Sequence, residues 1–417
     1  MENHRADTLI IGGGVIGLCI AYYAAETAGT VALIEKDRIP AGSSYGNAGL
    51  LVPSHCFPLA DPSMMREGIR QLFHPAGAFA IRLRAEPELF SWLWRFFRSC
   101  RKDRFFHAVR VLKQLGEEGI FLHHELAEKA QGRYRYRRSG MLMLYKKPDG
   151  LRKDARQLKE LGAESHVLSA QETRELEPSI QAKLAGGIFH PSDGMLQPAS
   201  FLSWLEGEAG KKGVSIHTET EAFDFKISGR RIESVYTTKG AFRTGRVVIA
   251  AGAWSPKLSR RLGLRLPIQP GKGYSLTFAG RPEAPRHPLI LAEPFIAVTP
   301  FEDMLRITGV FELSGLDRAI DPQRVRRIHR HAGAYIPGLS ERKPVEIWRG
   351  FRPCTPDDIP IVGKCAPFEN LWVASGHATR GISLGPWTGK RVSEMLMGKA
   401  LPLEKELSPE RFSGTTF

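Results

Sequence analysis

Apolar positions in the first forty residues form two short runs that flank a longer helical pattern. Residues 8–11 and 31–34 are aliphatic and β-branched, as is typical of buried parallel strands. Residues 15–28 between them carry small side chains on one helical face, among them Gly17 and Ala21. Small residues let a helix approach a strand closely. The pattern predicts a strand, a helix and a second strand in the order of a parallel βαβ unit.

The first predicted strand runs directly into a glycine-rich turn. Residues 12–17 read Gly-Gly-Gly-Val-Ile-Gly, which fits G-x-G-x-x-G. Gly12 permits the tight turn, Gly14 lets the backbone approach a pyrophosphate, and Gly17 allows close helix packing. The helix N-terminus offers N–H groups to phosphates, and Glu35 at the end of the second strand can bind ribose hydroxyls. The segment therefore predicts a dinucleotide site.

A second polar, glycine-rich loop follows at residues 41–50. A domain that binds only a nicotinamide cofactor needs no second binding loop here. A longer cofactor, which runs from adenine to an isoalloxazine ring, does need one. Ser43 and Ser44 suit pyrophosphate or ribityl contacts, and the backbone of residues 46–49 suits a flat ring. The loop favours FAD as the cofactor.

Four later segments have clear periodicity. Residues 218–225 and 232–238 predict paired strands, and residues 246–249 predict a buried strand that ends in a small-residue turn. Residues 321–335 predict an amphipathic helix with its basic face outward. Val325, Ile328, Ala332 and Tyr335 are expected to face inward.

Residues 86–104 place aromatic residues and arginines on one predicted helix. Two interpretations stay open. The helix could lie on a membrane surface, since basic and aromatic residues together suit one. It could instead pack on its own domain.

Composition narrows the class of protein. The 417 residues suit two domains. No apolar run is long enough to span a membrane, and residues 1–7 lack the features of a secretion signal, so we expect a cytoplasmic protein.

The five scattered cysteines predict reduced thiols and no structural metal. The net charge of +15 leaves three options: nucleic acid, an anionic membrane surface, or simply a basic surface. Residues 133–138 alternate bases with aromatics.

Four motifs resemble those of a known family. Residues 44–49 resemble an S-x-x-N-A-G loop, and residues 267–276 resemble P-x-x-P-x-K-G-Y-S. Residues 348–363 resemble G-x-R-P-x-T-P-D…P-x-x-G, and residues 370–386 run from a strand into a glycine-rich loop. On these motifs the chain resembles the D-amino-acid oxidase superfamily of FAD-dependent oxidoreductases, within it the bacterial D-amino-acid dehydrogenases.

The resemblance implies an α/β fold with two interleaved domains. A Rossmann-like FAD-binding domain of the glutathione-reductase type would take residues 1–54, 190–265 and 346–417. An α+β substrate-binding domain, built on a mixed or antiparallel sheet, would take residues 55–189 and 266–345. A helix is expected from about Pro386, in its first turn, to Met397, with its N-terminus toward the cofactor.

The resemblance also implies a site with non-covalently bound FAD and no metal. Arg352 matches the arginine that grips the substrate carboxylate in the family. Tyr274 could add its hydroxyl. Arg380 departs from the family patterns and could be a second carboxylate ligand or narrow the substrate choice. His55 and His377 are expected to have structural roles. The expected cofactor-binding residues are Gly12, Gly14, Ile16, Gly17, Glu35, Lys36, Ser43, Ser44, Asn47, Ala48, Gly49, Leu50, Ala222, Ala251, Gly252, Trp254, Gly376, His377, Thr379, Gly381, Ile382 and Ser383.

The activity that follows is oxidative deamination of a small amino acid, with hydride transfer from Cα to flavin N5. The resulting imino acid would hydrolyse to a keto acid and ammonia. The electron acceptor would be a quinone, a dye-like acceptor or O2, and peripheral contact with the inner face of the membrane stays open. Alternatives are glycine, proline, hydroxyproline or opine oxidation, a tRNA-modifying flavoprotein, and a non-catalytic flavin subunit of a larger electron-transfer complex. Nucleic acid is the less favoured partner.

Overall fold

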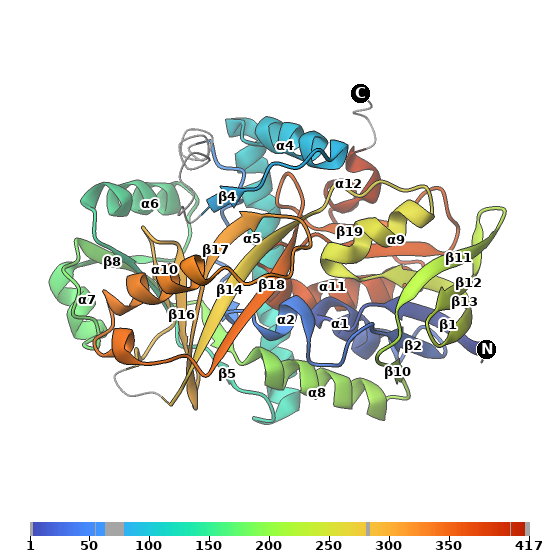
Figure 1. Ribbon diagram of the computed structural model, residues 1–417, viewed down its shortest axis with the longest axis horizontal. Coiled ribbons are helices and arrows are strands. Elements are labelled where there is room, and N and C mark those ends of the chain that lie inside the picture. The colour runs from blue at the N-terminus through green and yellow to red at the C-terminus, as the bar shows by residue number, and fades with distance from the viewer. Residues whose placement is uncertain (1–2, 55, 63–78, 281–283, 401, 413–417) are drawn as a thin grey trace.

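The computed structural model describes residues 3–54, 56–62, 79–280, 284–400 and 402–412. In these stretches the strands form three sheets. Figure 1 shows the first sheet, with β1, β2 and β13, toward the end of the molecule that holds the N-terminus. The second sheet, with β14, β17 and β18, lies nearer the middle, and the long helix α5 crosses between the two regions.

The first sheet has a parallel centre with antiparallel additions. Its main path runs β10 (Ser215–His217), β2 (Val31–Ile34), β1 (Asn3–Ile11), β13 (Gly240–Ile249), β12 (Arg231–Thr237) and β11 (Ala222–Ser228). The carboxyl half of β13 pairs in parallel with β20 (Leu371–Ser375), and β19 (Ile361–Lys364) pairs antiparallel with β20. The carboxyl ends of four parallel strands, β1, β2, β13 and β20, therefore lie along one edge of the sheet.

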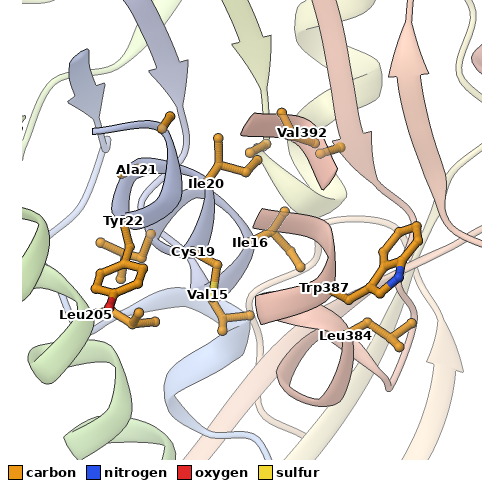
Figure 2. Close-up of a cluster of buried hydrophobic side chains, with 14 of the residues drawn as sticks. Val15, Ile16, Cys19, Ile20, Ala21, Tyr22, Leu205, Leu384, Trp387 and Val392 are labelled. Atoms are coloured by element: carbon orange, nitrogen blue, oxygen red, sulfur yellow. The ribbon is translucent and has the colours of Figure 1, made fainter. Parts of the chain in front are cut away.

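Helices cover one face of this sheet because small residues let them pack closely. The helix α1 (Val15–Ala24) packs against α11 (Gly381–Leu396) and α8 (Pro198–Lys211). Figure 2 shows Val15 of α1 beside the α11 ribbon, and Tyr22 of α1 beside Leu205 of α8. A Cβ added at Gly17 would lie 1.8 Å from the Gly12 oxygen, and one at Gly389 would lie 2.5 Å from the Cys19 backbone. Both glycines are thus required by close backbone contact.

The second sheet is mixed and mostly antiparallel. Its path runs β18 (Glu346–Cys354), β14 (Gln269–Ala279), β17 (Met304–Leu313), β16 (Ile296–Pro300), β15 (Leu289–Leu291), β6 (Met141–Tyr145), β8 (Gly186–His190) and β7 (His166–Ser169), with β4 (Phe79–Ile81) beside β17. The helix α10 (Pro322–Gly333) packs on it through Val325, Ile328 and Ala332. A small third sheet joins β3 (Leu50–Leu51), β9 (Gly194–Leu196) and β5 (Tyr136–Arg137).

The remaining helices connect or cover these sheets. They are α2 (Gly42–Tyr45), α4 (Pro87–Ser99), α5 (Lys102–Ala130), α6 (Pro148–Glu160), α7 (Ala170–Leu176), α9 (Ser255–Arg261) and α12 (Glu404–Leu407), with 3-10 turns at Gly252–Trp254, Leu339–Glu341 and Pro409–Phe412. No helix in the described stretches combines the length and apolarity that crossing a bilayer requires.

The expected elements are confirmed, with corrections to several of their bounds. The first helix, expected over residues 15–28, ends at Ala24, and the strand expected from residue 218 begins at Ala222. The predicted βαβ unit, the paired strands β11 and β12, and the inward residues of α10, with Tyr335 just beyond its end, are all present. The helix expected at residues 86–104 ends at Ser99, and a new helix begins at Lys102. The helix expected from about Pro386 begins at Gly381, so Pro386 lies inside it. The domain boundaries stay a prediction.

Candidate active site

A cleft lies at the carboxyl edge of the first sheet, where an open α/β sheet ordinarily binds its ligand. Its empty volume, including space open to solvent, is about 1220 Å³. Fifteen of the expected cofactor residues line it: Gly12, Gly14, Ile16, Glu35, Lys36, Ser43, Ser44, Asn47, Ala222, Ala251, Gly252, Trp254, His377, Gly381 and Ile382. Segments from both ends of the chain thus meet in one elongated cleft.

The turn before α1 forms a cradle in which a Cβ would not fit. Gly12 has φ +120°, and its added Cβ would lie 2.5 Å from the Ala250 oxygen. Gly14 is the N-cap of α1 and has no side chain to cap the helix. The first intrahelical bond runs from Leu18 N–H to Gly14 O, so the N–H groups of Val15, Ile16 and Gly17 have no acceptor within the helix. Val15 N–H donates to Ser44 Oγ over 3.0 Å, which brings the second glycine-rich loop against this helix end.

Glu35 organises the end of the cleft expected to hold the adenosine. Its Oε2 accepts from Gly13 N–H over 2.7 Å, and its Oε1 accepts from Asp37 N–H over 2.9 Å. Lys36 Nζ lies 4.5 Å from the centre of the Trp254 ring, so it shares this wall of the cleft. These contacts fix the carboxylate and the tryptophan at positions that suit a ribose and a flat base.

The loop after β2 is held from the second sheet. Ser43 Oγ donates to Phe351 O over 2.7 Å, and Phe351 N–H lies 3.0 Å from the same oxygen. Arg306 on β17 donates to the carbonyls of Tyr45 and Asn47 over 2.9 and 3.2 Å. Burial lowers the pKa of Arg306, and the bound carbonyls offset part of the cost of burying its charge. Sequence analysis missed Arg306 because nothing near it in the chain indicates the contact.

A second helix end faces the same cleft from α11. Gly381 and Ile382 line the cleft, and the first intrahelical bond runs from Leu384 N–H to Arg380 O. The N–H groups of this turn therefore point a partial positive charge at the cleft. His377 also lines it. Its Nε2 lies 2.9 Å from Thr388 Oγ1, while its Nδ1 is buried without a partner among the described residues. Burial lowers the pKa of His377 to about 3, so the ring is neutral.

The other seven expected cofactor residues are not among those that line the cleft. Gly17 packs α1 on the Gly12 turn. Gly376 has φ +82°, and a Cβ added there would lie 2.6 Å from the side chain of Thr355. Ser383 Oγ donates to Leu50 O over 3.1 Å, which joins α11 to β3. Ala48, Gly49 and Thr379 complete the set, and Thr379 is exposed. Lining residues that sequence analysis missed include Arg38, Thr220, Lys257, Phe351 and Pro353.

Arg352 lies on β18 beside the cleft, between two of its lining residues. Its Nη1 donates to Val310 O over 3.0 Å, and its guanidinium fills the space above Gly273, whose added Cβ would lie 2.3 Å from Nη1. Burial lowers the pKa of Arg352. Among the described residues no carboxylate lies within 4.0 Å of this guanidinium. The group is thus a partly buried cation with most of its donors free.

Arg380 is bound differently. Its Nη1 donates to Asp358 Oδ2 over 2.6 Å and its Nη2 to Phe57 O over 2.6 Å. The side chains of Arg380 and Asp358 are only 10% and 6% exposed, so the ion pair is shielded from water. Its charge is compensated within the protein.

Tyr274 does not meet Arg352. It pairs with Arg349 in the register of β14 and β18, while Gly273 pairs with Gly350. Because side chains alternate along a strand, Tyr274 lies on the face opposite to Arg352. Its hydroxyl donates to Glu312 Oε2 over 3.3 Å. The structure therefore does not bring Tyr274 to a carboxylate on Arg352.

Two further expectations concern residues away from the cleft. His55 lies outside the described residues. In the segment 133–138, Tyr134 is buried and Tyr136 binds His124 at 2.8 Å. Arg133 and Arg135 pair with Glu208 and Glu302. Arg137 also donates to Arg286 O over 3.4 Å. Both aromatic rings and three of the four arginines of this segment therefore make internal contacts, which disfavours an RNA interface.

The cleft fits FAD on its own geometry. A glycine cradle and a helix end suit the pyrophosphate, and a second helix end with the partnerless His377 Nδ1 lies farther along. The residues that would hold the nucleotide are those of the turn at Gly12–Gly14, Glu35, Ser43 and Ser44, and the first turn of α11. All five cysteines are free and buried.

Comparison with known proteins agrees with this geometry. A D-amino acid dehydrogenase of Vibrio atlanticus (strain LGP32) is 29% identical, over 97% of this chain and 100% of its own length. One of Helicobacter pylori is 27% identical, over 94% and 95%. The crystal structure of a glycine oxidase from Geobacillus kaustophilus superposes with a TM-score of 0.80 at 25% identity, over 98% of this chain and 99% of the other.

The expected fold class and the FAD cofactor are confirmed by these similarities. The model of the FAD dependent oxidoreductase (DAO) family matches residues 7–395, which is nearly the whole chain. The chain therefore belongs to the DAO family of FAD dependent oxidoreductases.

Proposed function

We propose that this enzyme oxidises the Cα–N bond of a small amino acid and that Arg352 binds the substrate carboxylate. The observation that carries the proposal is the guanidinium of Arg352, which is partly buried beside the cleft with no acidic partner among the described residues. Burying a cation without a counter-ion is costly, so an anionic ligand would stabilise the site. The planar guanidinium suits a carboxylate because it can donate two parallel hydrogen bonds.

The residues of this chain would position the substrate rather than take part in proton transfer. Bound FAD supplies the two-electron acceptor. The amino acid, held with its amine neutral, would lose the Cα hydrogen, and water would convert the imino acid to a keto acid and ammonia. His377 is neutral because burial lowers its pKa to about 3, which leaves it suited to orienting neighbouring groups.

A D-amino acid is our leading substrate. Two relatives that match nearly the whole chain are named D-amino acid dehydrogenases. The closely superposing glycine oxidase keeps glycine and other small amines as the alternative. In both cases Arg352 would have the same role, so substrate size and chirality are the open choices.

The deciding experiment is a substrate screen on the purified yellow protein. D- and L-amino acids, glycine, proline and hydroxyproline would be tested with an artificial dye and, separately, with O2 as acceptor. Each active amino acid would be paired with its amide, which lacks the carboxylate. We expect turnover of a small D-amino acid and at least a hundredfold preference over its amide. Equal turnover of acid and amide would remove the carboxylate from the proposal.

We also propose that α4 makes a peripheral membrane contact. Trp92 and Leu89 anchor its inner side, whereas Phe90, Trp94 and Phe97 are 55%, 47% and 49% exposed. Arginines follow these rings closely in the chain, a pattern that suits an anionic lipid surface. Co-sedimentation with anionic vesicles should fall in a Phe90→Ser/Trp94→Ser/Phe97→Ser variant. Unchanged co-sedimentation would contradict the contact.

A further inference from the structure

One buried carbonyl near the cleft depends on a side chain from another helix. Inside α11, the backbone nitrogen of Pro386 has no hydrogen and cannot donate to the carbonyl of Ile382, four residues earlier. That carbonyl lies 2.9 Å from Nε2 of His123 on α5. Since a carbonyl only accepts, the contact requires the Nε2–H tautomer of His123. The imidazole thus supplies the hydrogen bond that proline removes.

The environment of His123 keeps this donor in place. The side chain is fully buried, and burial lowers the pKa of His123 to about 4, so the ring is neutral at physiological pH. Its ring packs against Phe201 at 5.4 Å between centroids. Nδ1 has no partner among the described residues, so the contact with Ile382 is the hydrogen bond that fixes the ring.

The face of α5 that carries His123 is shaped to hold the first turn of α11. Gly119, one turn earlier on α5, would place a Cβ 2.7 Å from the oxygen of Ser383, so only glycine permits this approach. Glu118 accepts from Trp387 Nε1 over 2.7 Å and from Arg391 Nη2 over 2.9 Å. The two helices are therefore fastened along several turns, and His123 is the contact nearest the cleft.

Fixing one carbonyl fixes the next amide. Ile382 C=O and Ser383 N–H belong to the same planar peptide group. Ser383 N–H is one of the first-turn donors without an intrahelical partner, since the first helical bond starts at Leu384. Ile382 itself lines the cleft. The hydrogen bond from His123 thus sets the direction of this amide dipole, next to the cleft-lining Ile382.

We propose that His123 is a positioning residue that aims the first turn of α11 at bound FAD and thereby stabilises the reduced, negatively charged cofactor. The inference depends on FAD and on no particular substrate. A hydrogen bond or helix-end charge acting on a charged group in this way is worth about 1.4 kcal/mol, a factor of ten. Loss of the hydrogen bond from His123 to Ile382 O should therefore weaken the preference of the protein for reduced over oxidised FAD by about tenfold. For a two-electron couple that corresponds to a midpoint potential about 30 mV more negative.

The test uses the holoenzyme and two compensating variants. His123→Phe keeps the ring and removes the donor, so the midpoint potential of bound FAD should become more negative. Pro386→Ala restores a backbone N–H that can donate to Ile382 O. The double variant His123→Phe/Pro386→Ala should therefore return toward the potential of Pro386→Ala alone. His123→Gln, which retains a side-chain N–H, should be intermediate.

The matched control is His124→Phe. His124 is the next residue on α5, but its ring binds Tyr136 and not α11. Its variant should keep the wild-type potential, and thermal unfolding of each apoprotein reports stability separately. A wild-type potential in His123→Phe would overturn the proposal. An equal shift in the single and double variants would also overturn it, because the effect would then not pass through Ile382. If His123→Phe does not fold, His123→Gln with and without Pro386→Ala gives the same comparison. None of these readouts depends on amino-acid turnover.

Discussion

Arg352 and Arg380 are two partly buried arginines near one cleft, and their partners differ. Arg380 donates to Asp358 and to Phe57 O, both over 2.6 Å. Arg352 donates to Val310 O alone among the described residues, and no carboxylate there lies within 4.0 Å of it. Arg380 is neutralised by its own chain, while Arg352 retains an uncompensated charge and free donors. The difference separates a structural ion pair from a group suited to bind an anion.

Residue type alone did not make this distinction. Arg352 matches the carboxylate-binding arginine of the family, whereas Arg380 departs from the family patterns and was left open as a second carboxylate ligand. What separates them is Asp358, a side chain 22 residues from Arg380 that occupies its guanidinium. We therefore expect substitution of Arg352 to impair substrate binding, and substitution of Arg380 or Asp358 to lower the free energy of unfolding.

The largest effect is expected from Arg352→Ala. Losing one partner of a buried, hydrogen-bonded charge pair costs about 4 kcal/mol, so kcat/KM for amino acids should fall about 10³-fold. The flavin absorbance of the purified protein should stay unchanged. Arg349→Ala is the matched control, since Arg349 lies on the other face of the same strand and donates to Arg318 O. Wild-type kinetics in Arg352→Ala would exclude it as the carboxylate ligand.

A loss of stability rather than of binding is expected when the ion pair of Arg380 is broken. Asp358→Asn leaves the Arg380 charge shielded and unpaired, which should lower the free energy of unfolding by about 3 kcal/mol. Chemical denaturation measures this change. Arg380→Met/Asp358→Leu, which removes both charges, should recover part of the loss. If Arg380→Met instead raised KM tenfold at unchanged stability, Arg380 would be a substrate ligand and the comparison would fail.

The sequence predicts best where contacts are local. The turn at Gly12–Gly14, the helix after it and Glu35 all lie within one βαβ unit, and periodicity and spacing predict the turn, the start of the helix and Glu35 correctly. The start of α11 was misplaced by five residues, because a proline normally indicates a first turn. Here Pro386 is tolerated inside the helix because His123 supplies the donor to the carbonyl of Ile382, and His123 and Ile382 are 259 residues apart in the chain. No local pattern carries that information.

The contacts of Arg306 and of Asp358 were missed for the same reason. Arg306 reaches back across 261 residues to Tyr45 O, and the pairing of strands that brings them together is not encoded near either residue. The register of β14 and β18, which places Tyr274 on the face opposite Arg352, is likewise a property of two strands. A motif can name a residue without saying which face it occupies.

The smallest effect is expected from Gly273→Ala, which leaves Arg352 in place but alters its position. The added methyl would lie 2.3 Å from Nη1 of Arg352, so the guanidinium must shift. If Arg352 binds the substrate carboxylate, KM should rise about tenfold, since a displaced hydrogen-bonding pair loses about 1.4 kcal/mol. kcat should change less, and FAD should remain bound.

The matched control for this prediction is Ser275→Ala, on the same face of β14. The Ser275 hydroxyl is buried without a partner among the described residues, so its removal should leave KM unchanged. Steady-state kinetics at several substrate concentrations separates KM from kcat in both variants. A normal KM in Gly273→Ala, with a crystal structure showing the guanidinium displaced, would mean that substrate binding does not depend on where Arg352 points. Arg352 would then be, like Arg380, an arginine of the framework, and the contrast between the two would rest on stability alone.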